Sequence, residues 1–373
     1  MKAGRKLFQI HSLLGLVTGA LLLVISLSGS VLVFQEEIDQ ALNPDLLTVP
    51  VAGPRLPLNG LYAQAAGRHP RAEAIRFRRL PLGEGQALEM NVAEGGKHTL
   101  LYLDPYSGRV IGERQRYTFL VDWLLRLHYS LFLGEAGEIF VALLAVALVG
   151  SAATGLFIYR KYLWKVLLFR VPLTGKNWRV LSSGLHRIVG VWSLAFNVLI
   201  AVTGFYLHYP TLAAAFEPQE EPEPVGRLFR PSLSLDELVV RGTRVMPGFV
   251  PVSINLPTRS GDAIVLYGSV PGSPLLSPYG NWVAFDALTG SVSEVYDLRR
   301  QSRAAQLDSA LGTLHFGYYG GIAVKILYVL LGLTPAFLSL TGGLLWWRRK
   351  QTRSRTSRRT ARHPAPALEH TQG

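Results

Sequence analysis

Four stretches of the chain are long, apolar and free of charged side chains, and they constrain the fold more than any other feature. They cover residues 12–34, 139–159, 188–216 and 326–347. A helix rises about 1.5 Å per residue, so roughly 20 residues cross a bilayer core of about 30 Å. Pro210 should end the third helix, because proline lacks the N–H that a helix needs. The sequence therefore predicts an α-helical membrane protein with four transmembrane helices.

The first apolar stretch follows Lys2, Arg5 and Lys6, as the apolar part of a secretory signal peptide does. It is longer than that part usually is, and no clean small-x-small cleavage motif follows it. We therefore interpret this stretch as the first transmembrane helix.

Lys and Arg residues gather beside those helix ends that lie on one side of the predicted membrane. The loop between the second and third helices carries Arg160, Lys161, Lys165, Arg170, Lys176, Arg179 and Arg187, with no acidic residue. The C-terminal tail adds Arg348, Arg349, Lys350, Arg353, Arg355, Arg358, Arg359 and Arg362. Cytoplasmic loops are enriched in Lys and Arg, so both termini are predicted to be cytoplasmic. The formal net charge of +13 is thus a topology signal, and it does not indicate a nucleic-acid partner, because these cations lie beside predicted membrane helices.

The chain contains no cysteine. This excludes disulfides, iron–sulfur clusters held by thiolates, thiol catalysis and covalent c-type haem attachment. The sequence also has no glycine-rich phosphate loop, no His-Glu-x-x-His and no nucleophile elbow. No catalytic residue is assigned, and any redox centre must use ligands other than thiolates.

The predicted helices form an internal two-fold repeat with fixed spacings. His11 and His186 each stand four residues before a glycine and seventeen before a Ser/Thr-Gly pair. His128 and His315 each stand 26 residues before a Thr-Gly pair. The pairs are Ser28-Gly29, Thr203-Gly204, Thr154-Gly155 and Thr341-Gly342. One unit of two helices therefore occurs twice.

The segments outside the membrane repeat as well, and each predicts a helix followed by strands. The expected helices cover residues 56–68 and 234–246, and the expected strands cover 74–80, 88–93, 99–103, 250–256, 263–270 and 281–285. Each set ends in Asp-x-x-Ser/Thr-Gly, at residues 104–108 and 286–290. This motif is typical of a hairpin turn, in which the Asp side chain accepts hydrogen bonds from backbone amides and Gly takes a positive φ. The sequence thus predicts two α+β domains outside the membrane.

These patterns give predicted boundaries for the whole chain. They are residues 1–34 (N-terminus and first helix), 35–122 (first outer domain), 123–160 (outer pre-helix and second helix), 161–185 (basic cytoplasmic loop), 186–210 (third helix), 211–308 (acidic linker and second outer domain), 309–347 (outer pre-helix and fourth helix) and 348–373 (basic disordered cytoplasmic tail).

A histidine kept at one place in both copies suggests pairing across a pseudo-two-fold axis. His11 would face His186, and His128 would face His315. Two imidazoles that face each other across a bundle, in an apolar shell, are what a six-coordinate haem b requires. The glycines of the repeat would let a flat macrocycle lie against the helices. We therefore predict two haem b groups, with these four histidines as ligands of the haem iron.

An alternative interpretation remains open, since histidines at a membrane edge serve as polar anchors and small residues serve close packing. His208 has no counterpart in the first copy, and it would replace one outer ligand or contact a haem propionate. His128 lies 32 residues before Arg160, about 48 Å if helical, so the chain should bend, at Gly134 and Gly137. Glycines 317, 320 and 321 offer the same bend after His315.

These histidine-bearing helices, the paired Asp-x-x-Ser/Thr-Gly-x-Val phrases and the Thr-Gly pairs resemble the PepSY-associated transmembrane family over roughly residues 5–350. Many members are called iron-regulated membrane proteins, and some are bacterial inner-membrane ferric-siderophore reductases. The resemblance implies two periplasmic PepSY-like domains and haem b held at His11, His128, His186 and His315.

The resemblance further implies a haem-dependent oxidoreductase that passes electrons across the inner membrane and reduces a ferric siderophore, or another Fe(III) chelate, in the periplasm. The lipid bilayer is its other partner. The electron donor stays open between a quinol and a cytoplasmic reductase. One alternative is a PepSY-type module that binds or regulates a periplasmic peptidase without redox activity. A transporter is another, because duplicated membrane units are common in transporters.

Overall fold

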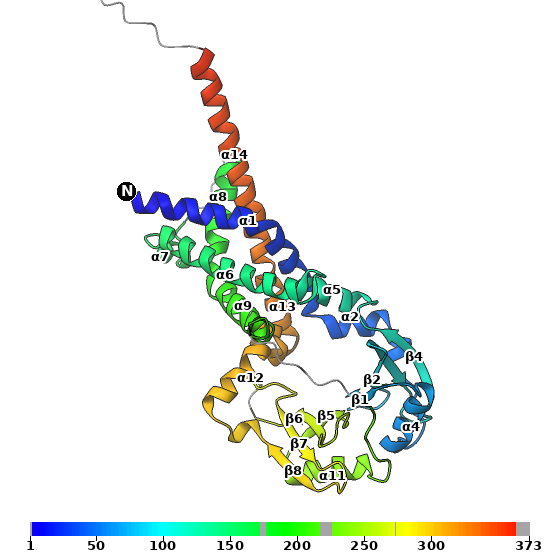
Figure 1. Ribbon diagram of the computed structural model, residues 1–373. Coiled ribbons are helices and arrows are strands. Elements are labelled where there is room, and N and C mark those ends of the chain that lie inside the picture. Colours follow the sequence, from blue (N-terminus) through cyan, green and yellow to red (C-terminus); the bar gives the residue numbers. More distant parts are fainter. Residues whose placement is uncertain (1, 172–176, 217–225, 273, 363–373) are drawn as a thin grey trace, which may run out of the picture. The chain divides into compact units, whose positions relative to one another are not determined.

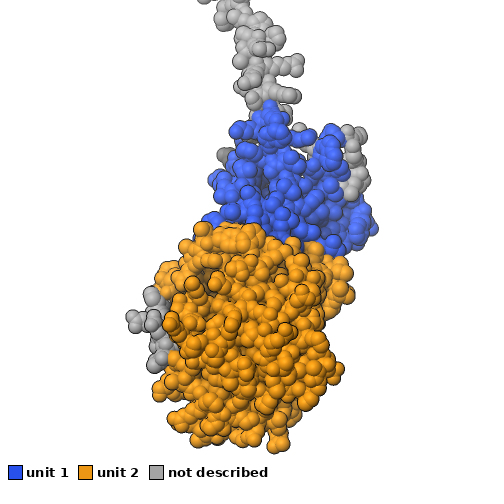
Figure 2. Space-filling model, turned by 90° about the vertical axis from the view of Figure 1, so that its right-hand side faces the viewer, with its two compact units in different colours: residues 1–30, 140–205, 330–373 blue, residues 31–139, 206–329 orange. Residues whose placement is uncertain are grey.

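The computed structural model describes residues 2–171, 177–216, 226–272 and 274–362. Part of the predicted acidic linker (217–225), Lys176 of the basic loop and residues 363–373 of the predicted tail lie outside the described residues. The chain divides into two compact units, which Figure 2 colours separately. Unit 1 comprises residues 1–30, 140–205 and 330–373, and unit 2 comprises residues 31–139 and 206–329.

Long apolar helices dominate unit 1. Three segments within the described residues are long and apolar enough to cross a membrane: Gly4–Leu32, Gly134–Tyr159 and Tyr318–Gln351. They correspond to α1 (Lys2–Leu32), α6 (Gly134–Tyr159), and α13 (Gly321–Gly332) with α14 (Thr334–Arg362) (Figure 1). The chain is therefore a membrane protein.

The third predicted spanning helix differs from its expected form. In its place are α8 (Trp178–Trp192) and α9 (Leu194–Leu207), which meet at an angle of 61°. The structure thus has three candidate spans among the described residues, or four if this bent pair counts as one span.

A buried polar network lies at the bend. Ser193 donates its hydroxyl to the Val189 carbonyl at 2.8 Å, a bond that competes with the helix ladder and bends helices. Asn197 donates to the Ser193 hydroxyl oxygen at 3.0 Å and accepts from Thr334 at 3.0 Å. Thr334 precedes Pro335 at the break between α13 and α14. Polar side chains at the two helix breaks therefore form hydrogen bonds with each other.

The basic tail also differs from expectation. It was predicted to be disordered from Arg348, but α14 continues as a helix to Arg362. Residues 348–362 contain neither glycine nor proline, and Pro364 is the first residue that must end a helix.

The main feature of unit 2 is one eight-stranded antiparallel sheet, in the order β4-β3-β2-β1-β5-β6-β7-β8. Its strands are β1 (Ala74–Arg79), β2 (Leu88–Glu94), β3 (Lys97–Leu103), β4 (Val110–Gln115), β5 (Val250–Asn255), β6 (Ile264–Ser269), β7 (Asn281–Phe285) and β8 (Val292–Tyr296). The two copies join where β1 pairs with β5, with Phe77 opposite Ile254. The two predicted outer domains therefore share one sheet.

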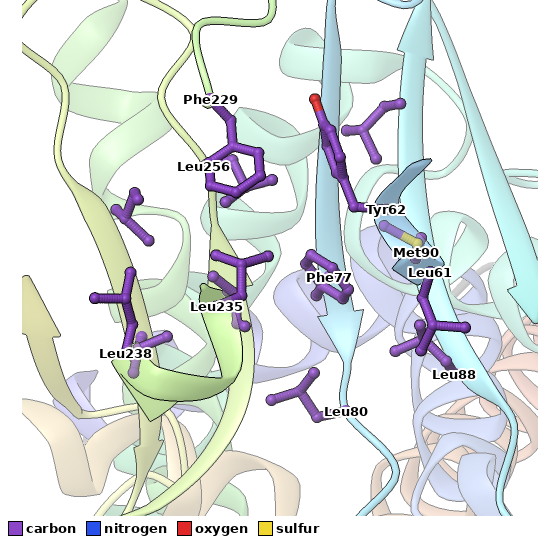
Figure 3. Close-up of a cluster of buried hydrophobic side chains, with 14 of the residues drawn as sticks. Leu61, Tyr62, Phe77, Leu80, Leu88, Met90, Phe229, Leu235, Leu238 and Leu256 are labelled. Carbon is purple, nitrogen blue, oxygen red and sulfur yellow. The ribbon is translucent and has the colours of Figure 1, made fainter. Parts of the chain in front are cut away.

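Two helices cover one face of this sheet, α4 (Leu58–Arg68) and α11 (Leu235–Val245). Figure 3 shows the apolar cluster where Leu61 and Leu235, one from each helix, lie near Phe77. All three side chains are at most 1% exposed. Burial of side chains of this size contributes about 1.5–3 kcal/mol each, so a single core stabilises both halves.

The two predicted hairpin turns are present, between β3 and β4 and between β7 and β8. Asp286 accepts the backbone N–H and the hydroxyl of Thr289, at 2.7 and 2.8 Å, and Gly290 has φ +67°. Those bonds from Thr289, with one from a neighbouring N–H, hold the pKa of Asp286 below its ordinary value. Asp104 makes equivalent bonds in its own turn, where Gly108 has φ +73°.

The remaining described helices include α5 and α12, which carry histidines, and several shorter ones. They are α2 (Gln35–Leu42), α3 (Pro44–Leu47), α5 (Leu120–Ser130), α7 (Leu163–Leu167), α10 (Tyr209–Ala214) and α12 (Arg303–Phe316), with the 3₁₀ turns η1 (Leu298–Arg300) and η2 (Tyr318–Gly320). Helix breaks occur at the predicted Gly134 and Gly317, whereas Gly137, also predicted to bend the chain, lies inside α6. Gly134 starts α6 with φ +59°, and Gly317 ends α12 with φ +73°.

The two copies cap each other's helices. Asp236 of α11 accepts from the Leu58 N–H at the start of α4, at 2.9 Å. Asn59 of α4 accepts from the Leu235 N–H at the start of α11, at 2.8 Å. Each side chain thus accepts from a backbone N–H at the start of the other copy's helix, where no bond within that helix is available.

We expect Asp236→Ala to destabilise the sheet unit by about 1 kcal/mol, the usual value of a helix cap. The measurement is thermal unfolding of the detergent-purified chain by tryptophan fluorescence, where unfolding should occur roughly 2–4 °C lower. Asp308→Ala, which removes an exposed carboxylate in α12, is the matched control. Equal midpoints for both variants would show that the cross-copy cap contributes nothing.

Candidate paired-histidine site

The first candidate site lies in unit 1, between α1 and α8. His11 and His186 face each other with ring centroids 6.3 Å apart and ring planes at 83°. Both side chains are half-buried. The structure therefore brings together the two histidines that share one place in the repeat.

The hydrogen bonds of His186 fix which ring nitrogen carries its proton. Its Nδ1 lies 2.8 Å from the Thr341 hydroxyl oxygen. The same hydroxyl lies within donating distance of the Phe337 carbonyl, at 2.9 Å, and when it donates there it accepts from the imidazole. Nδ1 then carries the proton of the neutral ring, and Nε2 keeps the lone pair that can bind a metal.

The same reasoning applies to His11, which contacts α6. Its Nδ1 lies 3.1 Å from the Thr154 hydroxyl oxygen and 3.1 Å from the Ser151 carbonyl oxygen. Thr154 donates its own hydrogen back along the helix, to the Gly150 carbonyl at 2.8 Å. Both oxygens accept from the imidazole, so His11 also presents Nε2. A second group that orients a ligating histidine in this way is usual in metal sites.

Glycines allow both histidines to approach the facing helix. A Cβ at Gly155 would lie 3.3 Å from Cε1 of His11, tighter than most side-chain contacts. A Cβ at Gly342 would lie 3.6 Å from Cε1 of His186, an ordinary contact. A larger residue at position 155 would thus push against the His11 ring, and one at position 342 would make an ordinary contact with His186.

The donor set and spacing fit a metal held between the two rings. Two imidazoles that bind one ion from opposite sides, with bonds of about 2 Å, place their ring centroids roughly 6 Å apart. An apolar hollow opens beside the pair, with Leu16, Leu148 and Leu338 among its lining residues. Neutral imidazoles in an apolar shell are the ligands of a six-coordinate haem b, so the residues present fit that group.

The second candidate site lies in unit 2. His128 of α5 and His315 of α12 also have ring centroids 6.3 Å apart, with planes at 48°. Phe316 packs edge-on against His315 at 5.7 Å and stacks on Tyr318 at 5.1 Å. This second pair thus has the same separation as the first pair, and the rings of Phe316 and Tyr318 lie beside it.

His208 lies against an acidic side chain of α6. Its Nδ1 is 3.8 Å from a carboxylate oxygen of Glu138, and Thr211 donates to the same oxygen at 2.6 Å. His208 is 9% exposed. Its predicted role, as an outer ligand or as a contact to a propionate, stays a prediction.

The orienting role of Thr154 and Thr341 was not foreseen. Both residues are part of the repeat, in Thr-Gly pairs at the same distance from a histidine, but that pattern predicted only room for a macrocycle or close helix packing. The folded helices place Thr154 opposite His11 and Thr341 opposite His186, the first of the paired histidines in each copy. A Thr-Gly pair kept in both copies was the available signal.

Fold and site together define a membrane protein with an antiparallel sheet unit and histidine pairs on its helices. A family model described as the PepSY-associated TM region matches residues 8–349. The chain belongs to this family.

An uncharacterized protein of Pseudomonas aeruginosa is 26% identical over 258 residues, which cover 62% of this chain. The match spans 64% of that protein's length.

Proposed function

We propose that this protein is an inner-membrane electron-transfer protein with two haem b groups, which reduces a ferric siderophore or a similar Fe(III) chelate in the periplasm. Both termini lie in the cytoplasm in this proposal, because the Lys and Arg clusters flank the corresponding helix ends. A quinol or a cytoplasmic reductase supplies the electron.

One observation carries the proposal: two histidine pairs, each from equivalent places in the repeat, have the same ring separation of 6.3 Å. Polar anchors at a membrane edge do not need to face each other. Close packing by small residues does not require a fixed tautomer either, and two threonines set that tautomer for His11 and His186.

The chain's own residues then have distinct tasks. His11 and His186 bind through Nε2 while Thr154 and Thr341 hold their rings in place. His128 and His315 form the outer ligand pair. Haem b, when bound, supplies reversible one-electron oxidation and reduction. The apolar lining excludes water, which lowers the local dielectric and affects the reduction potential.

The substrate chemistry follows from metal–ligand preference. A siderophore binds Fe(III) through hard oxygen donors, and the same donors hold Fe(II) more weakly. One electron from the donor converts Fe(III) to Fe(II) and so loosens the metal from its chelator. No proton or leaving group is needed for this step.

A dithionite-reduced minus oxidised absorption spectrum of the detergent-purified protein tests the proposal. We expect sharp b-type bands and about two haems per chain, one for each bis-histidine pair. A featureless spectrum after expression with ample haem would overturn the redox function. That result would leave a PepSY-type binding module as the function.

A further inference from the structure

The hollow beside His11 and His186 has a basic end. In α1 its lining runs from Phe8 to Leu22, about 20 Å along the helix. Two guanidinium groups line it as well, Arg187 and Arg349. The hollow is therefore apolar along most of its length and contains two cations.

Both cations lie against aromatic rings that line the same hollow. The guanidinium carbon of Arg349 is 4.5 Å from the centroid of Phe8, three residues before His11. That of Arg187 is 5.8 Å from the centroid of Tyr159 at the end of α6. Residues near the predicted cytoplasmic ends of the helices thus form this basic end.

Unit 1 gives these cations no counter-charge. Its only acidic residue is Glu369, which lies outside the described residues. Arg187 donates its Nε–H to the Ser183 carbonyl at 3.0 Å, which leaves its terminal N–H groups for another acceptor. Arg187 is half-buried and Arg349 is exposed, and a half-buried cation is stabilised when an anion pairs with it.

The two arginines do not follow the internal repeat. His186 matches His11, but the residue after each is Arg187 in one copy and Ser12 in the other. Eight residues after the threonine stands Arg349 in the second copy, where the first has Tyr162. At these offsets the imidazoles are duplicated and the guanidiniums are not, although the first copy has its own cations one and two positions earlier, at Lys161 and Arg160.

We propose that Arg187 and Arg349 bind the two propionates of the haem held by His11 and His186. This inference rests on the proposed function. Haem is an apolar plane with two carboxylates on one edge, and the hollow offers an apolar wall with two guanidiniums at one end. Charge-assisted bonds from a planar guanidinium suit a carboxylate. The propionate edge therefore faces the cytoplasmic end of the hollow.

The test compares ferric haem with its dimethyl ester, which has the same plane but no carboxylate charge. The protein is the full chain with His128→Ala, produced in haem-deficient cells and purified in detergent, so that only the first site binds. Binding is followed by the Soret absorption. We expect haem to bind about a hundredfold more tightly than the ester, because each charged hydrogen bond contributes roughly tenfold.

Arg187→Gln and Arg349→Gln should each weaken haem binding about tenfold and leave ester binding unchanged. Arg160→Gln is the matched control, since Arg160 is exposed and does not line the hollow. Equal weakening of haem and ester, or none, would overturn the assignment, and the second result would favour anionic lipid as the partner of these arginines. If the unsubstituted chain binds neither compound, the proposed function itself fails.

Discussion

The His186→Ala variant is expected to contain about one haem per chain where the unaltered protein contains about two, because a single remaining imidazole cannot hold a six-coordinate haem. His11 then has no ring opposite it across the 6.3 Å separation. The His128–His315 pair belongs to unit 2 and should keep its own haem. The measurement is haem per chain, with the reduced spectrum of the remaining group.

A graded variant and a surface control sharpen this result. Thr341→Val removes the acceptor of the His186 Nδ1–H, and loss of such an orienting partner weakens metal binding about 10–100-fold. His98→Ala, on the exposed end of β3, should leave the haem count unchanged. The two pairs should also differ in their ferric spin-resonance signals, because their ring planes meet at 83° and 48°. If His186→Ala instead loses the signal of the His128–His315 pair, the assignment of His186 as a ligand of the first haem is contradicted.

Local sequence patterns predicted most of the sheet. The six expected strands correspond to β1, β2, β3, β5, β6 and β7, because each contains buried apolar residues and lies inside the sheet. The two missed strands are its edges, β4 and β8. Their sequences, Val-Ile-Gly-Glu-Arg-Gln and Val-Ser-Glu-Val-Tyr, are polar as edge strands often are, and they give little periodic signal.

Features that depend on contacts between distant residues could not be predicted from the sequence. The β1–β5 pairing joins residues far apart in the chain, Phe77 and Ile254, and nothing local marks either strand as a partner. The bend at Ser193 depends on Asn197 and Thr334, which come together only in the folded bundle. Neither glycine nor proline stands at that bend, so the usual signals of a helix break were absent.

The candidate site was more accessible to sequence analysis than the fold around it. Duplication predicted which histidines should pair, and the structure places both pairs at one separation. A repeat reports symmetric features only, however. Arg187 and Arg349 occur in a single copy, so only the lining of the hollow revealed them.

The outer pair should control delivery of the electron to the chelate. We expect His128→Ala to lower Fe(III)-chelate reduction at least about a hundredfold, since the cofactor carries the redox chemistry. The first site should keep a haem that its donor still reduces. The assay uses right-side-out membrane vesicles with a respiratory substrate, an external ferric chelate and a chromogenic Fe(II) trap. Haem reduction is followed in the same vesicles.

Two further variants decide whether His128 or His208 is the ligand opposite His315. If His128 is the ligand, His128→Ala and His315→Ala lose the same haem, and His208→Ala keeps it. Glu138 already lies against His208 in the structure, and Thr211 donates to the same carboxylate, so we expect this first pattern. Loss of that haem in His208→Ala, with its retention in His128→Ala, would transfer the ligand role to His208. Full chelate reduction in all three variants would remove the outer pair from the electron path altogether.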